Sequence, residues 1–206
     1  MLPESPVPVS SGARPSSPGG GQEPVGLMRQ LRSLALWLLL ALLLRWIVVE
    51  PRWIPSGSML PTLQLQDRIL VEKVRPRFRQ PLTTGTIVVF HPPAALRAAG
   101  YDPGAALIKR VVAVGGDRVA VSAGQLRRND IPVQESWRSE PMDYELAPLT
   151  VPPDHVLVLG DNRNASLDSH LWGPLPVEDV IGTAIWRYWP LERFGPIRFS
   201  ANAPAG

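Results

Sequence analysis

Residues 107–114 read Leu-Ile-Lys-Arg-Val-Val-Ala-Val and are followed directly by Gly-Gly-Asp at residues 115–117. Ile and Val favour strands and Gly-Asp favours turns, so this stretch predicts a β-strand that ends in a tight turn. Successive side chains in a strand point to opposite faces, which gives Lys109 and Arg110 apolar neighbours on either side. We expect Lys109 to be partly desolvated there, whereas Arg110 could point to water.

Other short β-rich runs have the same character, namely residues 69–74, 86–90, 118–121, 156–159 and 180–186. Turn-forming residues separate them, and no amphipathic helical pattern of twelve residues follows residue 51. This pattern predicts a mostly β fold, an antiparallel domain with no internal repeat. Residues 122–150 are richer in charge, so we expect a small hairpin and loop excursion added to the main sheet.

The composition fits one domain with appendages. The chain has 206 residues, 45% of them hydrophobic, and its 24 prolines argue against an all-helical protein because proline disrupts helix interiors. It contains no cysteine, which excludes a disulfide framework, a thiolate metal site and a cysteine nucleophile. The net charge of +3 with only 19% charged residues gives no field strong enough to favour nucleic acid as a partner.

The N-terminal region combines two compositions. Pro, Ser and Gly make up sixteen of residues 1–26, which predicts a disordered tail. The arginines that flank the apolar run favour a cytoplasmic position for this tail. Sixteen of the nineteen residues 31–49 are apolar, and a helix of that length extends about 28 Å. We therefore expect a transmembrane anchor over residues 27–50 and a β domain over residues 51–206. A cleavable secretory signal is the alternative, because an apolar run follows Arg29 and Arg32.

One segment suggests nucleophilic chemistry. Residues 54–62 read Ile-Pro-Ser-Gly-Ser-Met-Leu-Pro-Thr, and the two prolines stiffen a turn that can present a hydroxyl, although they also suit a linker. A nucleophilic serine needs a base, and the chain has two lysines, Lys73 and Lys109, against nineteen arginines. Buried lysine can lose its proton whereas arginine cannot. Lys109 is the better candidate base, with Lys73 as a wetter alternative.

The chain resembles the bacterial type I signal peptidases, also called leader peptidases. Residues 55–63 read Pro-Ser-Gly-Ser-Met-Leu-Pro-Thr-Leu, and residues 160–170 read Gly-Asp-Asn-Arg-Asn-Ala-Ser-Leu-Asp-Ser-His. Both are specific to that family. The four segments similar to its sequence boxes are residues 54–63, 67–73, 107–117 and 160–176.

The resemblance implies a role for each matching residue. Ser58 matches the nucleophile and Lys109 the general base, while Ser56 and the backbone N–H of Ser58 match the oxyanion hole. Ser166 matches the hydroxyl that orients the lysine amine, and Asp168 matches the carboxylate that braces this region. The residues that match the shallow pockets for small substrate side chains are Ile54, Met59, Leu63 and Ile108. No cofactor and no metal are implied.

The sequence departs from the family pattern in a few places. Gln66 stands where many members have Gly, and Asn164 and Ala165 stand where Asp and Asn are frequent. His170 occupies a position often held by Arg. These departures leave the partner of Asp168 open and do not affect the Ser58 and Lys109 matches.

The implied activity is that of a membrane-bound serine endopeptidase that removes N-terminal signal peptides from exported preproteins by a Ser-Lys dyad mechanism. Its implied partners are signal-peptide-bearing preproteins and the lipid bilayer, with the secretion machinery as a further candidate. The expected location is the cytoplasmic membrane of a bacterium, crossed once, with the catalytic domain on the extracytoplasmic side. The alternatives are a specialised relative that processes a single substrate and a catalytically silent, membrane-tethered β interaction module.

Overall fold

The computed structural model describes residues 24–74, 80–135, 137 and 140–197. Most of the predicted tail, residues 1–23, lies outside the described residues. The chain divides into two compact units at Ala41 and Leu42. Helix α1 (Pro24–Val48) contains 25 residues and begins in the first unit. Among the residues that the structure describes, no helix is both long and apolar enough to cross a membrane.

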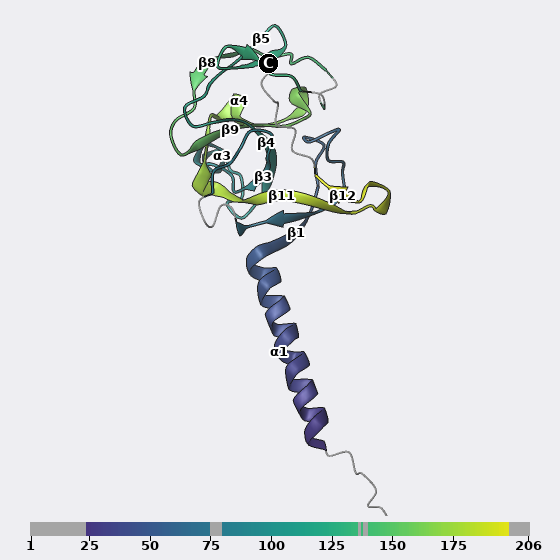
Figure 1. Ribbon diagram of the computed structural model, residues 1–206. Helices are drawn as coiled ribbons and strands as arrows, with labels where there is room; N and C mark the ends of the chain where they lie inside the picture. The colour runs from purple at the N-terminus through teal and green to yellow at the C-terminus, as the bar shows by residue number, and fades with distance from the viewer. Residues whose placement is uncertain (1–23, 75–79, 136, 138–139, 198–206) are drawn as a thin grey trace, which may run out of the picture. The chain divides into compact units, whose positions relative to one another are not determined.

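The second unit is built on an antiparallel sheet of eight strands (Figure 1). Its strand order is β1-β2-β11-β3-β4-β9-β10, and β12 pairs with β11 outside this path. The strands are β1 (Val49–Trp53), β2 (Arg68–Glu72), β3 (Ile87–Phe90), β4 (Leu107–Val114), β9 (His155–Leu159), β10 (Leu175–Pro176), β11 (Val180–Trp189) and β12 (Gly195–Pro196). The predicted mostly antiparallel β fold is therefore confirmed.

Strand β4 lies inside the sheet between β3 and β9. Six of its eight residues are buried, which explains why its sequence is a nearly continuous apolar run and not an alternating one. Its register with β3 places Lys109 opposite Val88 and Arg110 opposite Ile87. The two basic side chains of this strand are therefore held well inside the domain.

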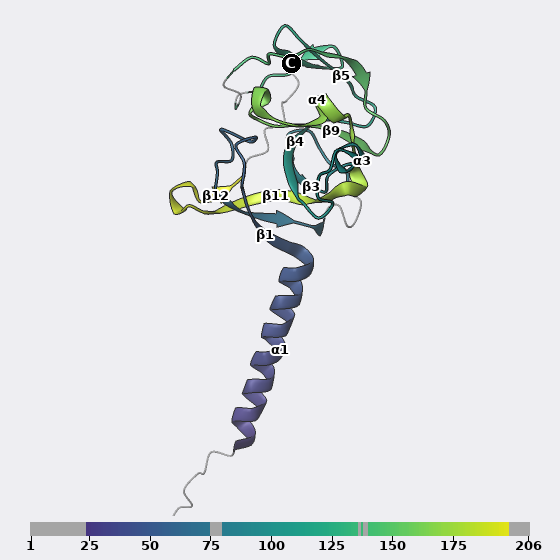
Figure 2. The ribbon, with the colours of Figure 1, turned by 180° about the vertical axis from the view of Figure 1, so that it is seen from behind.

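Four strands form a separate antiparallel sheet in the order β7-β6-β5-β8. Its strands are β5 (Arg118–Ser122), β6 (Gln125–Arg128), β7 (Ile131–Pro132) and β8 (Leu146–Thr150). Apolar side chains of this second sheet, including Val121 and Leu126, share a buried cluster with Leu157 and Leu159 of β9. In both views of the domain, β4 and β9 lie between the second sheet and β11 (Figure 2). The excursion expected at residues 122–150 thus joins β5 in a sheet of its own.

The described helices that lie wholly within this unit are short. They are α3 (Ala94–Ala98), α4 (Ser169–Trp172) and the 3₁₀ turns η1 (Arg163–Ala165), η2 (Val177–Asp179) and η3 (Leu191–Arg193). Strand β1 begins at Val49, directly where α1 ends, so the two last residues of the expected membrane segment pair with β2. Pro51 is tolerated in β1 because this strand is at the edge of the sheet.

Candidate functional site

Residues 54–67, which connect β1 to β2 and are called the Ser58 loop below, form a compact loop. Its two ends are tied together, because the backbone N–H of Ile54 donates to Asp67 O at 2.8 Å and that of Gln66 donates to Ile54 O at 2.7 Å. Within the loop, Leu60 N–H donates to Gly57 O at 3.1 Å. The loop therefore has little freedom, and Ser58 near its apex has a defined position.

Asp67 fixes this loop to the end of β11. Its side chain is fully buried and accepts hydrogen bonds from the backbone of Gln64 at 2.9 Å and from Arg187 Nη1 at 3.2 Å. Arg193 also forms an ion pair with it. Arg187 Nη1 donates in addition to the carbonyl of Thr62 at 3.0 Å. Hydrogen bonds to charged groups are among the stronger ones, so Asp67 is a structural anchor of the loop.

Ser58 and Lys109 meet although they are 51 residues apart in sequence. Lys109 Nζ donates to Ser58 Oγ at 2.8 Å, and the two residues are only 5% (Lys109) and 9% (Ser58) exposed. Burial disfavours the ammonium form and lowers the pKa of Lys109 from 10.5 to about 8, while the charges of Asp168 and Asp161 oppose this shift. A large fraction of Lys109 is then neutral at mildly alkaline pH, and a neutral amine can accept a proton from a hydroxyl at this distance.

Ser56 lies beside this pair. Its Oγ is 3.4 Å from Ser58 Oγ. At this distance the Ser56 hydroxyl can reach a substrate group that becomes bonded to Ser58 Oγ. A hydroxyl in that place can donate to a developing negative charge without burying a charge of its own. The placement is thus compatible with the oxyanion-hole role that the resemblance implies.

The segment 160–163, which follows β9, holds the Ser58 loop from the other side. The backbone N–H of Asn162 donates to Ser58 O at 3.1 Å, and its side-chain Nδ2 donates to Gly57 O at 3.2 Å. A Cβ at Gly160 would lie 2.5 Å from Ser58 O and 2.2 Å from Ser166 Oγ. Such distances leave no room for a side chain, so only glycine permits this close approach.

Asp168 is hydrogen-bonded to the same segment. It is fully buried, and its Oδ2 accepts the backbone N–H of Gly160 at 2.8 Å. Its Oδ1 lies 2.6 Å from Nδ1 of His170, and the His170 ring stacks on Tyr144 at a centroid distance of 4.0 Å. The partner of Asp168 that the sequence left open is therefore His170.

Ser166 lies next to Gly160. Its Oγ is buried and has no hydrogen-bond partner among the described residues. The orienting role that the resemblance implies for this hydroxyl remains a prediction.

Two buried ion pairs flank the 160–163 segment and were not anticipated from the sequence. Arg110 donates from Nε and Nη2 to the two carboxylate oxygens of Asp161 at 2.7 and 2.6 Å. Arg163 donates in the same bidentate way to Glu135, at 2.8 and 2.6 Å. The expectation that Arg110 could point to water is wrong, because this residue is only 1% exposed and Asp161 neutralises its charge.

The alternative base is paired with a carboxylate. Lys73, the alternative base, lies 3.3 Å from a carboxylate oxygen of Glu50 in a partly exposed ion pair. Among the described residues, no group of three or more His, Cys, Asp or Glu side chains could hold a metal ion. Lys109 is thus the lysine that the fold brings to a serine.

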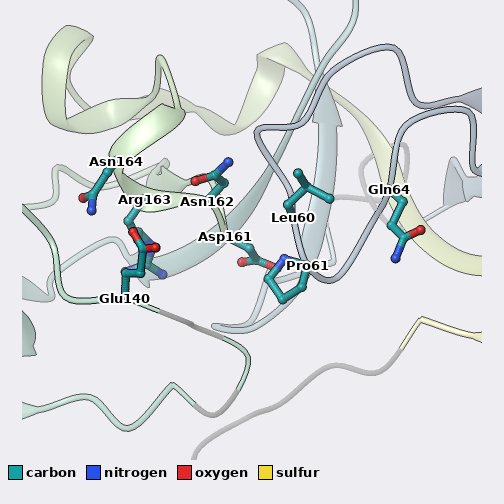
Figure 3. Close-up of a pocket in the computed structure, with 8 residues that line it drawn as sticks. All are labelled: Leu60, Pro61, Gln64, Glu140, Asp161, Asn162, Arg163 and Asn164. Atoms are coloured by element: carbon teal, nitrogen blue, oxygen red, sulfur yellow. The ribbon is translucent and has the colours of Figure 1, made fainter.

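The four residues matched to the substrate pockets share one core cluster: Ile54, Met59, Leu63 and Ile108. Each is at most 8% exposed. A separate surface pocket of about 390 Å³ lies beside the Ser58 loop. Figure 3 shows Leu60 and Pro61 on one side of it and Asp161, Asn162 and Arg163 on the other. This pocket is lined mainly by polar side chains and by none of the four matched residues.

The sequence model of the family described as signal peptidase, peptidase S26, matches residues 27–189. The chain belongs to this family. It is 50% identical over 168 residues to a probable signal peptidase I-1 of Synechocystis sp., covering 82% of this chain and 85% of that protein. It is 43% identical over 195 residues to a signal peptidase I of Leptolyngbya laminosa, covering 94% of this chain and 95% of that protein.

A chloroplast protein is also similar. The chain is 48% identical over 157 residues to a probable thylakoidal processing peptidase 2 of Arabidopsis thaliana, covering 76% of this chain and 42% of that protein. Membership of the signal peptidase family makes the chain a serine peptidase that removes signal peptides.

Proposed function

We propose that this signal peptidase cuts its substrates with Ser58 as the nucleophile and Lys109 as the general base. The observation that carries the proposal is the 2.8 Å contact between Lys109 Nζ and Ser58 Oγ. Burial supports it, since the pKa of Lys109 falls to about 8 and provides the neutral amine that a base requires.

The reaction follows from this pair. The Lys109 amine takes the hydroxyl proton as Ser58 Oγ attacks the scissile carbonyl carbon, which gives a tetrahedral intermediate and a Lys109 ammonium. The ammonium then protonates the leaving amine as the C–N bond breaks, leaving an acyl ester on Ser58. Water attacks this ester with Lys109 again accepting a proton, and the Ser58 hydroxyl is restored.

Neighbouring groups serve the same steps. The Ser56 hydroxyl, 3.4 Å from Ser58 Oγ, and the Ser58 backbone N–H stabilise the oxyanion of the tetrahedral intermediate. Ser166 orients the amine of Lys109, and Asp168 holds the segment that carries Ser166. Ile54, Met59, Leu63 and Ile108 form the apolar walls of pockets for small substrate side chains, and their tight packing in one core cluster suits shallow pockets.

The domain acts next to a membrane, with the apolar segment at residues 27–50 as its anchor. The support is the composition of residues 31–49, sixteen of nineteen of which are apolar, and the exposure of Leu34 and Trp37 in α1, which are 66% and 65% exposed. An exposed apolar surface of this kind is covered in the working protein, either by lipid or by another protein. The lipid bilayer is that partner, and preproteins reach the site from the secretion machinery.

The proposed location is the cytoplasmic membrane of a bacterium, crossed once, with the catalytic domain on the extracytoplasmic side. Relatives from cyanobacteria and from a chloroplast thylakoid make the thylakoid membrane the competing location. Fractionation of the source cells, followed by protease protection of the catalytic domain, distinguishes the two membranes and the two sides.

The test is cleavage of a preprotein with an Ala-x-Ala site by the purified chain in detergent, with sequencing of the product N-termini. We expect one cut after that site, and no cut with Ser58→Ala or Lys109→Ala. Lys73→Ala is the matched control, because it removes the other lysine of the chain and should retain full activity.

Absence of cleavage by the wild-type chain would favour the catalytically silent module. Cleavage of one preprotein among many would favour a specialised relative with a single substrate. Full activity of Ser58→Ala would refute the proposed mechanism itself.

A further inference from the structure

The connection between β7 and β8 sends two side chains toward the proposed active site. Glu135 and Trp137 both belong to this connection, and they line one small cavity together with Arg110, the residue that follows Lys109 in β4. They belong to the excursion of the second sheet, which supplies none of the residues of the proposed reaction. Their contacts nevertheless lead to Ser58.

The first contact path begins at Glu135. Its carboxylate forms the bidentate pair with Arg163, in which the side chains are 2% and 1% exposed. The same guanidinium donates from Nε to the carbonyl of Gly160 at 2.8 Å. The planar guanidinium has a fixed arrangement of donors, so the position of Glu135 determines where Arg163 can hold the Gly160 carbonyl.

The second path begins at Trp137. Its ring lies 4.2 Å from the guanidinium carbon of Arg110, which is a cation–π contact in a buried place. Arg110 in turn forms the bidentate pair with Asp161. Trp137 thus covers the arginine that fixes the next residue of the 160–163 segment.

Both paths end at the loop that carries the proposed nucleophile. Asn162, the next residue, donates to Ser58 O at 3.1 Å and to Gly57 O at 3.2 Å. Gly160 itself is within contact distance of Ser58 O, since a Cβ there would lie 2.5 Å away. A shift of the 160–163 segment therefore displaces Ser58 relative to Lys109, whose strand β4 is also paired with β3 on its other side.

We propose that Glu135 and Trp137 are positioning residues of the signal peptidase reaction, through which the second sheet sets the place of Ser58. The inference rests on the proposed role of Ser58 and Lys109. It gives the second sheet a function in catalysis that consists of holding the 160–163 segment, with no contact to substrate. A displacement of a reacting group by about 1 Å lowers a rate roughly 100-fold.

The main test is Glu135→Gln, which keeps the shape of the side chain and removes its charge. We expect kcat for an Ala-x-Ala peptide to fall about 10-fold or more, with KM changed less than about threefold, because the pocket residues are untouched. Asp130→Asn is the matched surface control, since Asp130 pairs with Arg118 in the same sheet but is exposed. It should leave kcat within about twofold of wild type.

A second comparison separates positioning from loss of stability. Leu126→Ala removes a buried side chain of the second sheet that has no part in either path, and it should lower Tm while leaving kcat nearly unchanged. Trp137→Leu, measured beside Trp137→Phe, keeps the inference testable if Glu135→Gln does not fold. The leucine variant should lose kcat, and the phenylalanine variant, which keeps an aromatic face, should retain most of it.

A double-mutant cycle gives the decisive measurement. If Glu135 acts through the 160–163 segment, the kcat losses of Glu135→Gln and Asn162→Ala will be less than multiplicative, whereas those of Leu126→Ala and Asn162→Ala will multiply. Multiplicative losses for the first pair, or an unchanged kcat in a folded Glu135→Gln variant, would overturn the inference. Full activity of Ser58→Ala would instead overturn the proposed function.

Discussion

The pKa of Lys109 fixes how catalysis should depend on pH. The folded-state pKa is lowered by burial to about 8, and the neutral amine is the active form, so activity rises as pH rises through this value. The neutral fraction is about 9% at pH 7, 50% at pH 8 and 91% at pH 9. We therefore expect kcat/KM to rise about 10-fold from pH 7 to pH 9 and then to level off.

The assay is initial-rate cleavage of an Ala-x-Ala peptide in detergent, from pH 5 to pH 10.5, with folding checked by circular dichroism at each pH. A lysine with its ordinary pKa of 10.5 would instead give a rise of about 100-fold from pH 7 to pH 9 without levelling. That result would refute the claim that burial lowers the pKa. Activity that increases as pH falls toward 5 would refute the lysine base altogether and indicate a carboxylic acid or histidine.

Other changes have equally definite outcomes. Lys109→Arg should abolish cleavage because a guanidinium cannot accept the proton, whereas Lys73→Arg should not, as peptide turnover will show. Lys109→Met should raise the free energy of unfolding at pH 7. Removal of the buried ammonium contributes about +3 kcal/mol, and loss of the hydrogen bond to Ser58 subtracts about 1 kcal/mol. This gain should shrink from about pH 8 upward, because the unfolded wild type then binds more protons than the folded form; denaturant titrations at pH 7 and 10 test it. Ser166→Ala should lower kcat but less than Ser58→Ala, with KM nearly unchanged, since orientation alone is lost. Removal of residues 1–26 should leave peptide cleavage nearly unchanged, and a large loss would show that the tail contributes to the site.

The strands that the sequence predicts well are those buried on both faces. Residues 107–114 form β4 with the predicted bounds, because an inner strand requires an apolar run. The bounds of strand β6 (Gln125–Arg128), which lies inside the hairpin expected at residues 122–150, could not be predicted, since only Leu126 among its residues is buried and a short polar strand has no distinctive pattern. Strand β1 could not be predicted, because the apolar run of α1 extends to its first residue, Val49, and the Glu, Pro and Arg that follow give no strand pattern.

Some residues of the candidate site could be predicted from the sequence and others could not. Ser58 and Lys109 could be predicted because their local sequences carry the family resemblance, and the structure brings them together. Glu135 could not be predicted, because its partner Arg163 is 28 residues away and the pairing depends on how the second sheet folds back. Sequence patterns report on local neighbours, whereas a buried ion pair between two sheets is fixed by topology. Arg110 gave one signal in advance, namely a charged residue within an apolar strand.

The near-exclusive use of arginine also defines the covalent chemistry of the surface. The chain has only two lysines, and Lys109 is 5% exposed, so an acylating reagent has Lys73 as its accessible lysine. The Lys73 side chain is 25% exposed and lies beside Glu50, away from the Ser58 loop. A fluorophore or biotin carried on an activated ester can therefore be attached to the natural sequence at Lys73. Burial keeps the label off the proposed catalytic amine of Lys109.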